Sequence, residues 1–173
     1  MELIITVVVA AVLLAIAIPN FNTVINSHRL LTVANDLVTE LNEARLEAIK
    51  LNSYTQLCSN SATSNTTDTL GAGCGTQLGA VYEQINNGGT LTASQLLQPT
   101  QDIDNTNIHV HGTFNAIRYD GLGFGYQPGT STPFTGTVVD LCSTSLNALN
   151  HIQVQMTGGS VITTSSPFTG TCP

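Results

Sequence analysis

The chain has 173 residues and a formal net charge of −7, and only 9% of its residues are charged. That length suits one domain with an extension. Lys and Arg together number four and Trp is absent. This composition argues against nucleic-acid binding, because affinity for phosphate grows with the number of cationic contacts and base stacking needs aromatic side chains. Nucleic acid is therefore not expected as a partner.

The chain begins with an apolar run behind a single acid. Glu2 is followed by residues 3–18, in which only Thr6 is polar, and then by Pro19. As a secretory signal peptide, the run has small residues at positions 15 and 17, which resembles a small-x-small cleavage site, but it lacks the basic residues that should precede it. As an ordinary membrane anchor, it would be roughly 24 Å long, slightly short of a hydrocarbon core of about 30 Å.

A third interpretation makes this run the first half of one long helix. From Leu30 onward, small and apolar residues recur at steps of three and four positions with polar residues between them. A helix from near Met1 to about Asn52 would be roughly 75 Å long, and Pro19 should kink or loosen it by removing a backbone hydrogen bond. We expect residues 1–27 to form a helix that is buried in lipid or among partners, and residues 28–173 to form a globular domain. The predicted buried stripe consists of Leu30, Ala34, Leu37, Leu41, Ala44 and Ala48.

After Asn52 the sequence changes to short β-prone runs between polar turns. Asp120-Gly121 is expected to connect two strands, Gly158-Gly159 marks a hairpin, and residues 59–75, rich in Ser, Thr and Gly, are expected to form a loop. These features predict an α+β fold in which the long N-terminal α-helix packs on a C-terminal antiparallel β-sandwich. Strands are expected within residues 53–58, 78–85, 106–126 (two strands), 136–142, 151–157 and 158–164.

The cysteine count is even, which in a polar, acidic chain indicates two disulfides and an oxidising compartment. Four cysteines allow three pairings, and the sequence alone does not choose among them. The simplest has two local rings. A zinc site would favour close C-x-x-C pairs, which the chain lacks. The cysteines are Cys58, Cys74, Cys142 and Cys172.

Other candidate ligands are sparse. His109 and His111 alternate on a predicted strand, so they face the same side, but no acid or cysteine lies close in sequence, which favours a surface pair over half a metal site. His28 and His151 are isolated.

Two further motifs are weak. Asp102 and Asp104 lack the glycine and closing glutamate of an EF-hand, so a solvated loop is expected there. Asn65-Thr66-Thr67 matches a glycosylation sequon that also occurs by chance. No nucleophile elbow, P-loop or paired carboxylates are present. No enzymatic activity, cofactor, metal site or DNA-binding residue is therefore predicted.

The N-terminal segment resembles that of type IV pilins and type II secretion pseudopilins. In "ELIITVVVAAVLLAIAIPNF", Pro19 follows Glu2 by 17 positions, which is the spacing of that family, and "LNEARLEAIKLN" resembles the next helical stretch of its GspH/FimT-like branch. "FNAIRYDGLGFGY" and the closing "VVDLC…HIQVQMTGGSVIT…TC" resemble the Gly-x-Gly turn and final hairpin of that branch. The family's processing motif, a glycine and a short hydrophobic lead, is missing. We therefore expect Met1 to be the residue before the glutamate and not the natural start.

This resemblance implies roles for particular residues. Glu2 would meet the free N-terminal amine of a neighbouring subunit as the helix moves from membrane to filament core, which would neutralise both charges in a dry bundle and set the axial register. Pro19 belongs to the same assembly helix, and the final hairpin implies a Cys142–Cys172 disulfide. The implied partners are other pilin subunits, in a homo- or hetero-filament, and the bacterial inner membrane before assembly. The implied final location is an extracellular pilus or a periplasmic pseudopilus.

The function predicted from this resemblance is a structural minor pilin that primes or caps a type IV pilus. One alternative is a pilus-tip subunit that captures DNA for uptake, and another is a type II secretion pseudopilin. In DNA-binding members of the family, arginines in the C-terminal hairpin contact DNA, whereas residues 155–166 of this chain contain no Arg or Lys. DNA capture is therefore less favoured than a structural role.

Overall fold

The computed structural model describes residues 2–100, 103–104 and 107–173, with side chains for all of these except residues 2 and 13–20. The helices are α1 (Glu2–Leu51), α2 (Ala62–Asn65) and α3 (Thr69–Cys74). The strands are β1 (Thr55–Leu57), β2 (Val81–Asn87), β3 (Thr90–Leu97), β4 (Ile108–His111), β5 (Ile117–Tyr119), β6 (Gly125–Tyr126), β7 (Gly136–Ser143), β8 (His151–Thr157) and β9 (Val161–Thr164).

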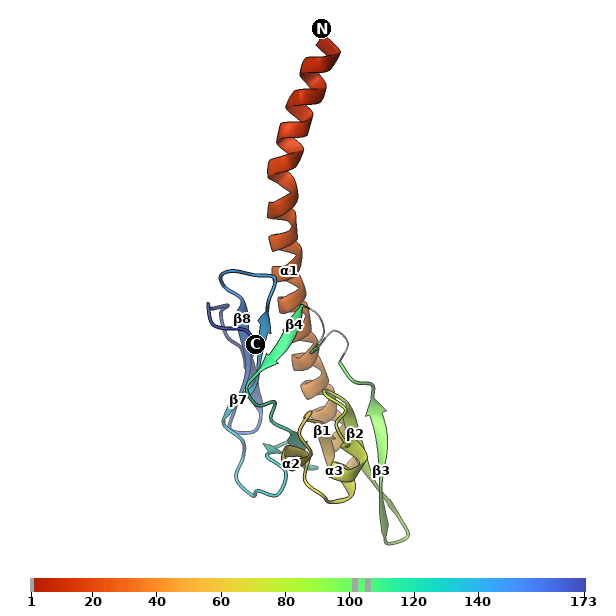
Figure 1. Ribbon diagram of the computed structural model, residues 1–173. Helices are drawn as coiled ribbons and strands as arrows, with labels where there is room; N and C mark the ends of the chain where they lie inside the picture. The colour runs from red at the N-terminus through yellow and green to blue at the C-terminus, as the bar shows by residue number, and fades with distance from the viewer. Residues whose placement is uncertain (1, 101–102, 105–106) are drawn as a thin grey trace.

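Helix α1 determines the shape of the molecule. It is one continuous helix, and its N-terminal half projects as a free rod beyond the sheets (Figure 1). Its C-terminal half packs against both sheets, and the whole predicted stripe is buried in their shared core. The amphipathic pattern was therefore predicted correctly. The buried stripe residues are Leu30, Ala34, Leu37, Leu41, Ala44 and Ala48.

The strands form two antiparallel sheets. One has the order β3-β2-β1-β5-β6 and the other has the order β4-β7-β8-β9. In β8 the apolar residues alternate with polar ones and face the core, as is usual for a sheet covered on one side, whereas β7 has a register shift between Thr137 and Val139. The predicted α+β arrangement, a long N-terminal helix followed by antiparallel sheets, is confirmed.

A backbone contact between two glycines joins the two sheets. The amide of Gly125 in β6 donates to the carbonyl of Gly159, in the β8–β9 turn, at 2.7 Å. Gly159 has a φ of +68°, and an added Cβ would lie 2.5 Å from the Gly125 oxygen. Both the conformation and the close approach therefore require glycine at position 159. From α1, Arg45 Nη1 donates to the Ser160 carbonyl at 3.0 Å, which attaches the same turn to the helix.

Residues 59–75, which were expected to form a loop, contain the short helices α2 and α3. The Asp68 carboxylate caps α3 by accepting a hydrogen bond from the Gly71 amide at 3.0 Å. Gly71 lies so close to α2 that an added Cβ would be 2.1 Å from the Asn65 carbonyl oxygen. Ser, Thr and Gly have low helix propensity, so the sequence did not predict these helices. Tertiary packing and capping outweigh propensity in this segment.

The strands of the central region also differ from the expectation. Strand β3 was not predicted, and its Ala, Ser and Gln residues are weak strand formers. It pairs with β2 through the turn at residues 88–89, where both glycines have positive φ. The stretch 106–126 contains three strands instead of two, and β4 lies in a different sheet from β5 and β6. The Asp120-Gly121 turn does connect two strands, β5 and β6.

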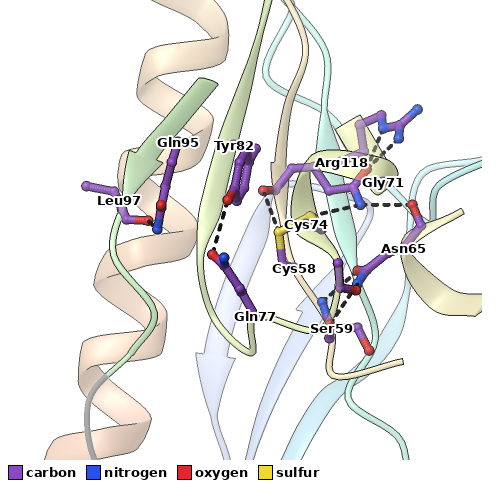
Figure 2. Close-up of a disulfide and its surroundings, with 12 residues drawn as sticks. Cys58, Ser59, Asn65, Gly71, Cys74, Gln77, Tyr82, Gln95, Leu97 and Arg118 are labelled. Atoms are coloured by element: carbon purple, nitrogen blue, oxygen red, sulfur yellow. Dashed lines mark hydrogen bonds between the residues drawn. A yellow bond between two sulfur atoms is a disulfide. The ribbon is translucent and has the colours of Figure 1, made fainter. Parts of the chain in front are cut away.

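Two disulfides close local rings. Cys58, directly after β1, bonds to Cys74 at the end of α3, and Cys142 in β7 bonds to Cys172 near the C-terminus. Figure 2 shows the first disulfide beside the labelled residues of α3 and β2. Each ring ties an irregular segment to a sheet, and the chain-entropy model assigns about 3–4 kcal/mol of stability to rings of this size.

Among the acids of α1 whose side chains are described, Glu40 is the one whose surroundings most affect its ionisation. It accepts a hydrogen bond from the Thr100 hydroxyl. Burial raises the pKa of the Glu40 carboxyl to about 7; the Thr100 hydrogen bond opposes this shift, and the charges of Asp36 and Glu43 add to it by smaller amounts. Because the folded state holds this proton more tightly than the unfolded chain, stability should fall as the pH rises from about 4.5 to about 7.

We therefore predict that Glu40→Gln removes this fall. At pH 8 the variant should be more stable than the parent by about 1–2 kcal/mol, a value reduced because the half-buried carboxylate keeps part of its hydration. At pH 4 the two should be nearly equal. Chemical denaturation of the full chain in detergent, followed by circular dichroism from pH 4 to 8, measures this difference.

Thr100→Val provides a second test of the same contact. It removes the hydrogen bond that favours the ionised Glu40, so the fall in stability should shift to higher pH. If the Glu40→Gln variant kept the parent's loss of stability between pH 4.5 and 7, this explanation would be wrong.

Candidate functional site

The most distinctive surface of the molecule is the N-terminal part of α1, residues 2–27, which we call the stem; residues 28–173 are called the head. Ten large apolar side chains of the stem are 48–76% exposed. They lie on every side of the helix, so no single face is protected. These side chains are Leu3, Ile4, Ile5, Val7, Val8, Val9, Val12, Phe21, Val24 and Ile25.

Such a surface is unstable in water. Burying one large aliphatic side chain contributes about 1.5–3 kcal/mol, and here ten remain exposed. A helix that is apolar on all sides is normally covered by lipid or by other helices. The stem is therefore a surface that needs a partner.

Two hydroxyl groups of the stem form hydrogen bonds within the helix itself. The Thr6 hydroxyl donates to the Leu3 carbonyl at 2.9 Å, and the Ser27 hydroxyl donates to the Val24 carbonyl at 2.9 Å. Each hydroxyl is thereby satisfied within its own helix. Both residues can accordingly be covered by an apolar partner without leaving an unpaired hydroxyl hydrogen.

The two predicted assembly residues lie in this stem. Glu2 is the first residue of α1, and the helix runs without interruption through Pro19. The side chains of both residues lie outside the described set. Among the side chains that are described, no helical segment reaches the length and hydropathy of a membrane span.

The transition from stem to head occurs within α1 itself. His28 and Arg29 are exposed, whereas Leu30 and Val33 are buried. The Thr55 hydroxyl of β1 donates to the Ala44 carbonyl of the helix at 2.7 Å, which adds a buried polar contact to the apolar ones. The head therefore holds α1 along more than five turns, while the stem extends freely.

The head has a surface cleft of about 490 Å³ lined by Tyr54, Arg118 and Tyr126, among others. The Arg118 guanidinium is already engaged, donating to Asp68 Oδ1 at 2.8 Å and to Gln56 Oε1 at 2.9 Å. The hydrogen bond from Arg118 lowers the pKa of Asp68 to about 2, so this pair contributes stability above pH 3.8 that is lost as the pH falls toward 2. This arrangement anchors β5 to α3.

The two histidines of the predicted pair, His109 and His111, each lie near a different acid. His109 Nδ1 lies 3.6 Å from Asp104 Oδ1, whereas His111 Nδ1 lies 3.7 Å from Asp140 Oδ2. His151, isolated in the sequence, contacts the same Asp140. The sequence did not predict the grouping of His111, Asp140 and His151. Strand register brings Asp140 next to one histidine 29 positions before it and another 11 positions after it. Asp102, of the predicted solvated loop, lies outside the described residues.

The sequon at Asn65 is not available on the folded surface. The Asn65 side chain is fully buried, accepting from the Ser59 amide at 2.7 Å and donating to the Ser59 and Gly75 carbonyls. Figure 2 shows Asn65 turned toward Ser59. The Asn65 side-chain amide thus provides hydrogen-bond partners for backbone groups of Ser59 and Gly75, beside α2 and α3. Its role is structural.

The family model for type II transport protein GspH matches residues 33–159. The chain belongs to the GspH family. The match begins in the buried half of α1 and ends in the β8–β9 turn, so it covers most of the head. No curated protein and no solved structure matches the chain. GspH proteins form a structural family, and membership supports a pseudopilin-like role in a type II secretion or type IV pilus assembly with other pilin subunits.

We predict that the GspH head folds without the stem. A chain starting at His28, exported so that both disulfides form, should be monomeric in detergent-free buffer and should unfold cooperatively. Its stability should match that of the full chain in detergent, because none of the described side chains of residues 3–25 belongs to the core. Size-exclusion chromatography with light scattering and thermal unfolding measure both properties.

A chain starting at Leu37 is the matched control. It loses Leu30, Val33 and Ala34 from the core and should be destabilised by several kcal/mol, since removing one buried leucine side chain costs about 2–5 kcal/mol. Equal stability of the two truncated chains would contradict the proposed boundary.

Proposed function

We propose that this GspH-family protein is a structural minor subunit of a type IV pilus, located at the priming or tip position. Its stem would pack among the stems of other subunits, and its head would face outward. The observation that carries the proposal is the stem itself, a continuous helix whose ten described large apolar side chains are exposed. The rigid connection of the stem to the core supports a mechanical role.

Before assembly, the stem would anchor the protein in the inner membrane with the head on the periplasmic side. The exposed apolar side chains of the stem support this location, because lipid and a helical bundle satisfy the same surface. In this proposal residues 1–27 act as the membrane and filament-core helix, and residues 28–173 act as the globular pilin domain.

Glu2 would direct the stem from the membrane into the filament. A carboxylate costs about 2.5–3.5 kcal/mol at mid-depth in a bilayer. The N-terminal amine of a neighbouring subunit would neutralise it in the bundle, and this pairing would fix the axial register of one subunit against the next. Pro19 would contribute through its missing backbone donor, which allows the helix to adapt during the same transfer.

The same architecture would serve a type II secretion pseudopilus, which is the second candidate. Both disulfides lie in the head, and the surface is rich in Thr and Asn with few charges. These features support exposure on a pilus outside the cell, because disulfides persist in oxidising environments. Deleting the gene in its host distinguishes the two: loss of surface pili supports the proposal, whereas loss of protein secretion with intact pili supports the pseudopilus.

DNA capture is supported less well by the charges of the head. Three of the four cations are engaged: Arg118 with Asp68, Arg45 with the Ser160 carbonyl, and Lys50 with Glu47. Few cations thus remain for phosphate. A gel-shift assay with the chain starting at His28 tests this alternative, and micromolar, salt-sensitive binding would favour it.

We predict that Glu2→Ala and Glu2→Gln impair assembly without affecting folding. Incorporation into sheared filaments should fall about tenfold or more, which corresponds to about 1.4 kcal/mol of lost pairing free energy. The amount in the membrane fraction should stay constant, because the helix remains apolar. Quantitative immunoblots of filament and membrane fractions measure the ratio.

Glu43→Ala is the matched control, since Glu43 is an exposed acid on the same helix but lies in the head. Its incorporation should equal that of the parent. Unchanged incorporation of both Glu2 variants would show that the carboxylate does not direct assembly.

A further inference from the structure

A group of potential metal ligands lies on the second sheet. It consists of His111 in β4, Asp140 in β7 and His151 in β8. These strands are neighbours in the sheet order β4-β7-β8-β9. The filament role described above uses none of these three side chains.

Strand register explains how the group is assembled. His111 pairs directly with Asp140 across β4 and β7, so their side chains share a face. His151 pairs with Cys142, which lies two positions after Asp140 and thus faces the same way. Since Val139 and Leu141 alternate with these residues and are buried in the core shared with α1, the group lies on the opposite face of the sheet.

The distances are close to those of a coordination sphere. His151 Nδ1 lies 3.0 Å from Asp140 Oδ1, and His111 Nδ1 lies 3.7 Å from Asp140 Oδ2. One ligand atom from each of the three residues lies within 4.8 Å of the others. Ligands about 2.0–2.2 Å from a tetrahedral zinc ion are roughly 3.3–3.6 Å apart. A shift of about 1 Å in the exposed His111 ring would therefore complete the arrangement.

The surroundings hold two of the ligands firmly and leave one side open. The His151 side chain is only 2% exposed, and its ring stacks on Phe168 with centroids 5.2 Å apart. The neighbouring Cys142–Cys172 disulfide fixes the C-terminal segment that covers this ring. Asp140 Oδ2 accepts a hydrogen bond from Gln153 Nε2 at 3.1 Å, which orients the carboxylate. By contrast, the His111 side chain is 45% exposed.

We infer that His111, Asp140 and His151 form a binding site for one divalent transition-metal ion of the zinc class, with a fourth coordination position open to solvent. Imidazole and carboxylate ligands suit zinc and its neighbours better than calcium or magnesium, which prefer oxygen ligands alone. Two histidines and one acid form a known donor set for zinc with an open position. The bound ion would tie the edge strand β4 to β7 and β8.

Calorimetric titration of the full chain tests this inference. The protein is prepared in detergent with a tag that contains no histidine, stripped with a chelator, and titrated with zinc chloride alone. We expect one ion per chain with micromolar or tighter affinity, together with a rise in melting temperature with zinc concentration. Cobalt(II) should give the visible absorption of a tetrahedral site.

Three variants make the assignment specific. His111→Ala should weaken zinc binding at least tenfold, and its exposed position makes loss of folding improbable as a cause. Asp140→Asn keeps the shape of the acid and should weaken binding to a similar degree, with circular dichroism checking the fold. His109→Ala is the control, because His109 lies on the same strand but contacts Asp104 instead, and its affinity should stay within twofold of the parent.

Two results would overturn the inference. One is the absence of saturable binding to the parent chain at about 1 mM zinc, which would leave a hydrogen-bonded His151–Asp140 pair with His111 nearby and no metal site. The other is an equal loss of affinity in the His109→Ala and His111→Ala variants, or no loss in either, which would place the ion elsewhere.

Discussion

The structure depends on one helix that satisfies two different environments. The C-terminal half of α1 contributes a stripe of Leu and Ala to a closed core, so it requires only one covered face. In the N-terminal half, the large apolar side chains that the structure describes lie on all sides of the helix and are exposed. Since both halves belong to the same continuous helix, the folded head of the full chain carries the exposed stem with it. Folding and assembly are therefore encoded in adjacent segments of one element.

The head compensates for its short strands with specific polar contacts. Asn65 satisfies the backbone around α2 and α3, and Arg118 joins β5 to the cap of α3. The two disulfides secure the segments with the least regular structure. Such buried polar groups stabilise a unique arrangement only when each is paired, and these are paired with several partners each.

Periodic features could be predicted from the sequence, and features that depend on tertiary register could not. The stripe from Leu30 to Ala48 follows the helical period, and the Gly158-Gly159 hairpin has its own turn chemistry, so both were predicted correctly. The helices α2 and α3 were missed because a capping aspartate and a close glycine contact outweigh poor propensity. The grouping of His111 with His151 was also missed, because it depends on which strands become neighbours and in which register, and no local pattern reports that.

The continuity of α1 also determines how tension would pass through the protein. A force applied along the stem reaches the head through the same helix, and it is resisted by the buried stripe, the Thr55 hydroxyl and the Arg45 guanidinium together. These contacts are arranged along the pulling direction, so they are loaded in shear and share the force instead of opening one after another. The glycine contact between Gly125 and Gly159 then transmits that load from one sheet to the other. In a fibre built from such subunits, an axial pull on the stem would therefore be shared by the core contacts of each head.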